Sequence, residues 1–520
     1  MRLLALIAVV VAMACGGDAA NGPAGSTVGS TVGATPRPAA RLVIDETRDT
    51  LNAIGERIVL FAYVEQDGVR NLADSVVWTS LDAAVVAVDS SGLATSRQTG
   101  IATVIAMRGA LTDTVHIVSR QVIAVVRAAS AAETLFVGDT VAPSLTAYDS
   151  NGVKMVLPQQ PTYMVAASNI SQVANGLFRG DAAGSGFVVA RVGIASAVIP
   201  ILVDGPFTMI STGGDHACAL VASGRVYCWG SAVNGQTGAP DQYFSNAPRA
   251  VAGLPSVVAI DAGPAESCAW TTAGEVYCWG TGFGPVPKRF TTSGPALSVS
   301  AGPSAMCAIT TTHMVNCWGI DDSRLPQLQS ISLDGGGQAC GLDDPGQLVC
   351  WGGQFRTTPT IMAPPSGFRS LDAGGGVACS IAADDSIRCY VGHFGDPGVA
   401  SMPAGLPRAK QVTRGVDHTC ALLFDASAIC WGDNYWGQLG DGTQTSARTS
   451  PTTVGGDLRF TSINASGYAT CALTTDGRAF CWGYAFFGAS GSATTDSCGF
   501  GDVCNVRPVR VSRQLYKPFR

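Results

Sequence analysis

Apolar and polar residues alternate with a period of two along most of the chain beyond residue 40. Between residues 41 and 120 the segments RIVLFAYV, SVVWTS, AVVAVD, GIATVIAMRG and DTVHIVSR follow this rhythm, with turn signals such as Asp67-Gly68 and Ser91-Gly92 between them. Such alternation turns one face of a segment to a core and the other to solvent, which predicts β-strands. Short strands at this spacing predict an all-β fold that begins with a β-sandwich over residues 41–120.

A weaker copy of the same rhythm occupies residues 121–204, with Tyr163 in the place of Trp78 and Gly176 in the place of Gly92. We therefore expect two tandem sandwiches, each held by packing because neither contains a cysteine. The stretch VVWTSLDAAVVAVDSSGLATSRQTGIATVIA resembles the bacterial immunoglobulin-like group 2 domain. That resemblance implies a stalk or spacer on a surface protein.

From Pro206 onward one segment recurs seven times, and each copy contains two cysteines ten positions apart. Alternation on both sides of a central turn predicts an antiparallel hairpin, in which the two cysteines face each other. Opposed residues of a non-hydrogen-bonded pair have Cα atoms about 4.5 Å apart, which a disulfide can bridge. The predicted disulfides are Cys218 with Cys228, Cys268 with Cys278, Cys307 with Cys317, Cys340 with Cys350, Cys379 with Cys389, Cys420 with Cys430, and Cys471 with Cys481.

Two other uses of these cysteines are zinc binding and a helical hairpin. Zinc sites favour closely spaced cysteine pairs and would need two further ligands per repeat. A helical hairpin needs a long helical pattern, which these segments rich in Gly, Thr and Val lack. Disulfides persist in oxidising compartments, so the seventeen cysteines indicate an exported protein.

The first cysteines of successive repeats lie 50, 39, 33, 39, 41 and 51 residues apart, which is typical of β-propeller blades. The sequence thus predicts a seven-bladed propeller over residues 205–515. The sixth copy, with Gly415, His418, Trp431-Gly432 and the loop from Gly437 to Gly442, resembles the regulator of chromosome condensation repeat family. The resemblance spans about 310 residues. It implies that His418, like His216 in the first copy, supports the blade backbone.

Ring closure is expected from the two ends of the repeat region. Most repeats are preceded by a P-x-x-V segment such as residues 248–251, and the first is not. Residues 507–511 have the right form to supply this strand by pairing with residues 207–211. An N- and C-terminal strand closure would remove exposed edges.

The chain opens with one positive charge and an apolar run that is too short to span a bilayer, so residues 1–14 read as a signal peptide. Small residues before Cys15 resemble a bacterial lipobox, which implies lipidation at that cysteine; an ordinary secretory signal is the alternative. Residues 16–40 are rich in Gly, Ser, Thr and Pro and predict a flexible tether. We expect an outer-membrane or cell-surface lipoprotein, and a secreted or periplasmic protein if Cys15 is not lipidated.

Charge and motifs narrow the function. The 520 residues carry a net charge of −6 and only four lysines, which disfavours nucleic acid as a partner. None of the common hydrolase, zinc-protease or nucleotide-binding motifs is present in the sequence, so we expect no enzyme, no metal, no cofactor and a monomer.

Long loops follow Cys228, Cys430 and Cys481, in neighbouring blades of a closed ring, and they contain aromatic residues. Aromatic side chains that are exposed on such loops can anchor a protein interface. The alternative is that these aromatic side chains pack between blades. The candidate partner-binding residues are Tyr243, Phe244, Tyr435, Trp436, Tyr484, Phe486 and Phe487. Cys498 and Cys504 are expected to staple the seventh loop, and calcium binding by Asp496 and Asp502 is the less favoured use of that loop.

Together these features predict a non-catalytic, membrane-tethered surface module whose propeller binds a protein or glycan. One alternative is an exported inhibitor that caps a hydrolase, since some bacterial β-lactamase inhibitor proteins are similar propellers. Guanine-nucleotide exchange, implied by the name-giving member of the repeat family, is disfavoured by export.

Overall fold

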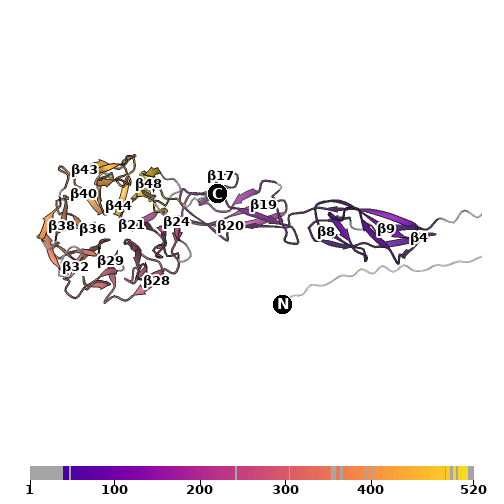
Figure 1. Cartoon of the computed structure of the whole chain (residues 1–520), viewed down its shortest axis with the longest axis horizontal. Helices are drawn as coiled ribbons and strands as arrows, with labels where there is room; N and C mark the ends of the chain where they lie inside the picture. The colour runs from indigo at the N-terminus through magenta and orange to yellow at the C-terminus, as the bar shows by residue number, and fades with distance from the viewer. Residues whose placement is uncertain are drawn as a thin grey trace, which may run out of the picture. The chain divides into compact units, whose positions relative to one another are not determined.

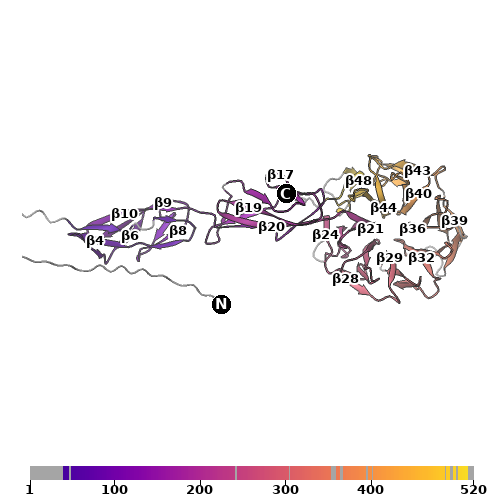
Figure 2. The same ribbon diagram turned by 180° about the vertical axis from the view of Figure 1, so that it is seen from behind.

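The computed structural model describes residues 39–45, 49–157, 159–239, 243–303, 305–352, 359–363, 367–393, 396–400, 402–485, 488–491, 496–498 and 502–512 (Figure 1, Figure 2). The regular elements in these ranges are the β-strands β1 to β48. The described residues contain no helix that is long and apolar enough to span a membrane. The predicted signal peptide, Cys15 and most of the predicted tether lie outside the described residues. The chain divides into two compact units, residues 1–122 and 123–520.

The first unit is a β-sandwich of three sheets with the orders β2-β10-β9-β6, β1-β4-β5 and β3-β8-β7. Its strands are β1 Arg41–Ile44, β2 Thr50–Leu51, β3 Arg57–Val59, β4 Ala62–Gln66, β5 Val69–Leu72, β6 Val77–Ser80, β7 Val86–Val88, β8 Leu93–Ser96, β9 Gly100–Arg108 and β10 Leu111–Ser119. Leu51, Val104 and Ile117 form its buried core. Trp78 packs against this core and over Gly92, where a Cβ would meet the indole nitrogen at 3.0 Å. The tryptophan and the glycine turn therefore belong to one packing unit.

The second unit begins with the same arrangement, in the orders β12-β20-β19-β16, β11-β14-β15 and β13-β18-β17. Its strands are β11 Val125–Ala128, β12 Glu133–Phe136, β13 Thr140–Val141, β14 Leu145–Tyr148, β15 Lys154–Met155, β16 Thr162–Val165, β17 Ile170–Ala174, β18 Leu177–Gly180, β19 Gly184–Val192 and β20 Ala195–Asp204. Tyr163 lies over Gly176 as Trp78 lies over Gly92, with its hydroxyl 3.3 Å from where a Cβ would be. The two copies share one sheet topology even though the second lacks the tryptophan.

Seven antiparallel sheets follow, which we name blades 1 to 7, and they form a ring (Figure 1). Their strands are β21 Phe207–Thr212, β22 His216–Val221, β23 Val226–Ser231 and β24 Phe244–Ala250; β25 Ala259–Ala262, β26 Glu266–Trp270, β27 Val276–Gly280 and β28 Gly284–Phe290; β29 Ala296–Gly302, β30 Ala305–Thr310 and β31 Val315–Trp318; β32 Leu328–Leu333, β33 Gln338–Asp343, β34 Leu348–Gly352 and β35 Thr360–Ala363; β36 Ser370–Gly374, β37 Val377–Ile381, β38 Ile387–His393 and β39 Asp396–Val399; β40 Ala409–Arg414, β41 His418–Leu423, β42 Ala428–Asn434 and β43 Thr445–Thr453; β44 Phe460–Ser466, β45 Ala469–Thr474, β46 Ala479–Tyr484, β47 Asp496–Cys498 and β48 Asp502–Arg510. The first strand of each blade lies nearest the ring centre; β24, β28 and β43 lie at the rim (Figure 2).

The two middle strands of every blade carry the cysteine pair at directly opposed positions. All seven pairs form disulfides with Cα atoms 4.1 Å apart. Each disulfide packs against the next blade: Cys218 and Cys228 pack with Trp279, and Cys420 and Cys430 with Trp482. Since neighbouring residues of a strand face opposite ways, the cysteine faces the next blade and the following tryptophan the previous one. The Cys-Trp pair of the repeat thus builds the core between blades.

The expected strand closure is wrong. Residues 507–510 belong to β48, which pairs with β46 in their own blade, placing Val509 opposite Cys481. The first strand β21 pairs with β22 instead. The P-x-x-V segments are likewise outer strands of the hairpin before them, as β24 pairs with β23. A repeat period alone does not reveal which hairpin an edge strand joins, so the assignment was shifted by one blade.

Blades 1 and 7 meet through contacts between whole blades. Phe207 N donates to Gly477 O at 2.9 Å, and Trp229 Nε1 donates to Ala489 O at 3.1 Å. Phe136 of the second sandwich covers this junction, with its ring centroid 4.5 Å from that of Phe207 and 5.0 Å from that of Tyr227. The second sandwich and both blades therefore share one hydrophobic cluster.

Candidate binding face of the propeller

Two kinds of connection lie at one end of the propeller. They are the turns between the first and second strands of each blade and the loops between the third and fourth strands. Because strand direction alternates within a blade, both connections emerge at the same end. We call this end the loop face. The three long loops that contain the candidate aromatics lie on it.

A cavity of about 880 Å³ lies on the ring axis. Its lining comes from the first strands of all seven blades and from their turns on the loop face, which include Gly214, Pro264 and Gly467. Gly335 and Gly375, two more lining turn residues, are exposed. The cavity therefore reaches the surface at the loop face.

A belt of seven short polar side chains surrounds the axis, one per blade, each opposite the first cysteine of its blade. Every belt side chain accepts a hydrogen bond from a backbone N–H of the following blade. The bonds are Ala262 N to Ser211 Oγ (2.9 Å), Ala301 N to Asp261 Oδ2 (2.8 Å), Leu333 N to Ser300 Oγ (3.0 Å), Ala373 N to Ser332 Oγ (3.0 Å), Arg414 N to Asp372 Oδ2 (2.9 Å), Ala465 N to Thr413 Oγ1 (2.8 Å) and Thr212 N to Asn464 Oδ1 (2.6 Å). The last bond joins blade 7 to blade 1.

Charge in the cavity is mainly negative. Asp261 and Asp372 lie deep inside the ring, yet both keep partial access to the cavity because their side chains face it. Burial raises the pKa of Asp372 to about 6, although hydrogen bonds from Arg414 N and Thr413 oppose the rise. Burial also raises the pKa of Asp261. Arg414, which lines the same cavity, has its pKa lowered by burial.

The buried histidines of blades 1 and 6 hold neighbouring blades together. His216 Nε2 lies 2.8 Å from Ser267 Oγ, and His418 Nε2 lies 2.8 Å from Thr470 Oγ1. Burial lowers the pKa of both rings to about 3, so they are neutral near pH 7. Both rings fill space that Gly213 and Gly415 leave open. The two hydroxyls are buried as well, and they donate to Gln236 O and Gln438 O, so each histidine belongs to a structural network between blades.

Long loops dock on the next blade through a backbone carbonyl. Gln236 O accepts from Trp279 Nε1 at 2.8 Å, and Gln438 O accepts from Trp482 Nε1 at 2.9 Å. The backbone of the G-Q loops therefore packs between blades.

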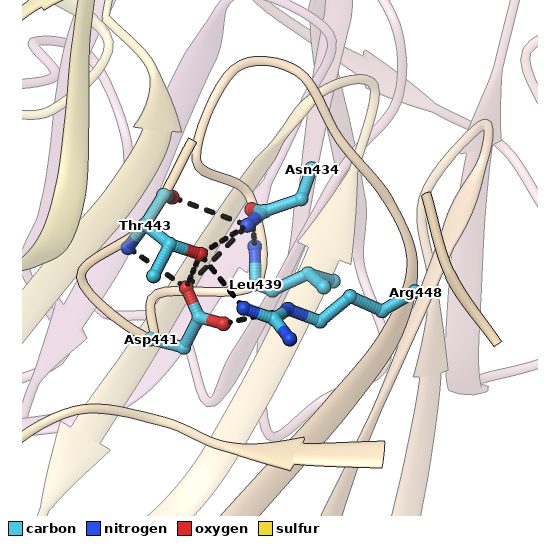
Figure 3. A network of polar contacts seen from close by, with 5 residues as sticks. All are labelled: Asn434, Leu439, Asp441, Thr443 and Arg448. Atoms are coloured by element: carbon cyan, nitrogen blue, oxygen red, sulfur yellow. Dashed lines mark hydrogen bonds and ion pairs between the residues drawn. The ribbon is translucent and has the colours of Figure 1, made fainter. Parts of the chain in front are cut away.

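The sixth loop is held by a buried polar network between β42 and β43 (Figure 3). Asn434 Oδ1 accepts from Leu439 N at 3.1 Å, and Asp441 Oδ1 accepts from Thr443 N at 2.9 Å. Arg448 Nε forms an ion pair with Asp441 Oδ2 at 2.9 Å. Because Arg448 already neutralises Asp441, the network fixes the loop rather than a ligand.

Three candidate aromatics come together on this fixed loop and on β46. The Trp436 ring centroid lies 4.8 Å from that of Tyr435 and 5.0 Å from that of Tyr484, both edge to face. Tyr435 is 38% exposed, and the other two are half-buried. We call these three residues the aromatic triplet. It presents apolar area at low conformational cost, since its rings brace one another.

The other candidate residues lie apart or outside the description. Tyr243 and Phe244 on the first loop are 79% and 50% exposed, and no ring contact joins them to the triplet among the described residues. Phe486 and Phe487 lie outside the described residues. Cys498 and Cys504 form a disulfide. Asp496 Oδ2 accepts from Val506 N at 3.2 Å, and no group of three or more His, Cys, Asp or Glu able to hold a metal occurs within the described ranges.

Comparison with protein families supports the repeat structure. Models of the "Regulator of chromosome condensation (RCC1) repeat" match residues 208–236 and 460–489, and 223–270 and 425–473. The model "Bacterial Ig-like domain (group 2)" matches residues 44–119. The chain carries RCC1 repeats behind a bacterial Ig-like domain.

Several known proteins are similar to part of this chain. The chain is 37% identical over 83 residues to "Probable E3 ubiquitin-protein ligase HERC4" from Homo sapiens, covering 16% of this chain and 8% of that protein. It is 27% identical over 179 residues to "Ultraviolet-B receptor UVR8" from Arabidopsis thaliana, covering 31% and 41%. Among solved structures, Prp20p from Saccharomyces cerevisiae is 16% identical with a TM-score of 0.38, covering 59% and 77%. The ACR4 receptor kinase ectodomain from Arabidopsis thaliana is 23% identical with a TM-score of 0.39, covering 54% and 97%.

Sequence reasoning missed the belt of the RCC1-repeat propeller. Its signal is a Ser, Thr, Asp or Asn just ahead of the glycine turn in every repeat, as in Asp261-Ala262-Gly263 and Thr413-Arg414-Gly415. Short side chains with an oxygen acceptor are common in β-rich sequences, so the pattern has meaning only when the blades are aligned on their cysteines.

Proposed function

We propose that this protein is an exported, non-catalytic binding module tethered to a membrane through Cys15, whose loop face engages a protein partner. The aromatic triplet carries the proposal. Tyr435 and Trp436 stand on a loop fixed by the Asp441–Arg448 ion pair, and Tyr484 stands on β46 of the next blade. Disulfides staple both blades. A rigid, partly exposed aromatic patch loses little conformational entropy on binding, which favours it as an interface anchor.

Partner capture tests the surface. We expect wild-type protein to retain a partner from the extracellular fraction of the native host, and Trp436→Ala to lose it. Phe424→Ala is the matched control, since Phe424 is 54% exposed and lies in a hairpin turn at the opposite end of its blade. Equal capture by both variants would count against the triplet. If no protein is captured, binding to a defined glycan array is measured next. Glycan binding by the wild type that is lost in Trp436→Ala would identify the partner as a carbohydrate.

The inhibitor alternative uses the same surface and differs in outcome. If the captured partner is a hydrolase whose activity falls on binding, the module is an inhibitor. Guanine-nucleotide exchange has the least support, because exported disulfide-rich proteins do not meet cytosolic GTPases.

Tethering has its own test. The intact mass of protein taken from the membrane fraction is expected to correspond to a chain that begins at acylated Cys15 and contains eight disulfides. A mass that retains Met1 with free thiols would contradict export.

A further inference from the structure

We propose that the cavity on the ring axis binds an organic cation, the ammonium or guanidinium group of a small molecule or of a polypeptide. Three carboxylates line it, Asp261, Asp334 and Asp372, against one cationic side chain, Arg414. Three negative charges and one positive charge leave an excess of two negative charges when all are ionised. The proposal rests on the cavity alone and stands or falls independently of the aromatic triplet.

The carboxylates are held in place without being neutralised. Asp372 accepts from Thr413 Oγ1 at 2.8 Å and from Arg414 N at 2.9 Å, and Asp334 Oδ1 accepts from Gly336 N and Gln338 N at 2.8 Å each. All of these donors are neutral groups. No ion pair to Asp261, Asp334 or Asp372 occurs among the residues that the structure describes.

Arg414 does not neutralise this charge by direct contact. Its guanidinium donates to Thr419 Oγ1 at 2.8 Å, to Val416 O at 3.1 Å and to Gly374 O at 3.3 Å. These acceptors hold it to the turns of blades 5 and 6. A mobile cation in the cavity would therefore meet negative charge that the protein itself leaves uncompensated.

Two of the residues that line the cavity, Gln338 and Ser370, also have a buried oxygen acceptor without a partner among the described residues. Gln338 is 1% exposed, and its side-chain Oε1 has no hydrogen-bond partner within the described part of the chain. Ser370 Oγ, on the next blade, is also buried and without a partner there. Buried acceptors without partners are costly, so a donor that reaches them gains affinity. Both atoms lie on blades 4 and 5, the blades that contain Asp334 and Asp372.

The size of the cavity suits such a guest. Pockets for small molecules span about 300 to 1,000 Å³, and this cavity of about 880 Å³ lies in that range. It opens on the loop face, so both a free amine and a lysine or arginine side chain of a docked polypeptide can enter.

Binding should depend on pH because Asp372 titrates near pH 6. The charged groups that face it are Asp334 from the turn after β32, Arg414 from β40 and Asp261 from β25, and the charge of Asp261 adds to the rise of the pKa of Asp372. A cation favours ionised Asp372. Affinity is therefore expected to fall as the pH drops from 7.5 to 5.

Calorimetric titration of the full chain tests the proposal with three probes: 1,5-diaminopentane, its neutral analogue 1,5-pentanediol, and the peptide acetyl-Gly-Lys-Gly-amide. We expect the diamine to bind and the diol not to bind. Binding of the diamine identifies a small-molecule site, and binding of the peptide alone identifies a polypeptide source. Equal binding of diamine and diol, or no binding of either cation at millimolar concentration, would overturn the proposal.

Asp372→Asn is expected to lower the affinity for the diamine about tenfold or more, because two charges attract each other strongly in a buried site. The fold should tolerate it because Asn464 holds the same belt position in blade 7. Asp384→Asn, at an exposed turn, removes the same charge elsewhere and should leave affinity within about twofold. Indistinguishable affinities for the two variants would refute the site, and Asp261→Asn repeats the comparison if the first variant does not fold.

Discussion

At the scale of single residues, the belt shows how one side chain can join two blades. Each belt residue is short, which brings its oxygen within reach of the N–H of the next blade, and each lies opposite a cysteine that faces the core between blades. Four belt members end in a hydroxyl and are buried, whereas Asp261, Asp372 and Asn464 are larger and reach the cavity surface. The same position therefore serves both ring cohesion and cavity chemistry.

Protonation of Asp372 predicts a pH dependence of stability. Its folded pKa, about 6, lies above the ordinary value of 3.8, so the folded state binds a proton more readily than the unfolded state. Its stabilising contribution is complete below pH 4 and is lost as the pH rises through 6. The wild type should therefore lose about 2 kcal/mol more stability than Asp372→Asn between pH 4 and 7.5. Denaturant unfolding of both proteins across this pH range measures the difference. Hydrogen bonds from Ser386 lower the pKa of Asp384, so this carboxyl stays ionised across the window, and Asp384→Asn should leave the pH dependence almost unchanged.

The glycine three residues ahead of the buried histidine predicts a steric effect. A Cβ on Gly415 would overlap the His418 ring and lie 2.8 Å from Gly467 O. Gly415→Ala should therefore destabilise the protein by about 1 to 3 kcal/mol in denaturant unfolding. Gly205→Ala is the control, because its Cβ would make only an ordinary 3.7 Å contact with Ala183. Equal losses for both would mean that the glycine is not kept by packing.

At the scale of elements, every disulfide closes a hairpin that local sequence already favours. The ten-residue separation assigns each closure roughly 2.5 to 3 kcal/mol on the loop-entropy estimate. Replacing Cys420 and Cys430 by Ala should lower the free energy of unfolding by about that amount, measured in denaturant with the other disulfides intact. The disulfide between Cys498 and Cys504 joins β47 to β48 at the edge of blade 7 and closes a shorter loop. Replacing these two cysteines by Ala should therefore lower the free energy of unfolding by less. The reverse order would contradict the estimate.

Sequence reasoning succeeded where a pattern is local. The seven hairpins follow from cysteine spacing and alternation, and the second sandwich follows from Tyr163 and Gly176 in the places of Trp78 and Gly92. It failed where partners are distant in sequence: the strand at residues 507–510 was assigned to blade 1 although it pairs with β46. The cavity was also not predicted, because its lining comes from seven strands that are far apart in the sequence. Only three-dimensional arrangement brings Asp261 and Asp372 to one cavity.

At the scale of the whole second unit, the second sandwich braces the junction between blades 1 and 7. Besides Phe136, Asp139 of this sandwich forms an ion pair with Arg510 of blade 7 at 2.7 Å. Arg225 of blade 1 pairs with Asp204 at 3.1 Å. The sandwich thus contacts both blades at the place where the ring has no covalent continuity, and it takes over the stabilising role that the sequence suggested for a shared strand.

Phe136 should therefore matter to the propeller even though it belongs to the sandwich. It is 5% exposed and packs against Phe207 and Tyr227, so Phe136→Ala is expected to cost about 3 to 5 kcal/mol through lost burial and a cavity at the junction. Phe187→Ala, at a position 43% exposed on the same sandwich, should have a small effect. Hydrogen exchange locates the effect: faster exchange in β21 and β45 with Phe136→Ala supports bracing, whereas loss confined to β11 to β20 would mean that Phe136 stabilises only its own domain.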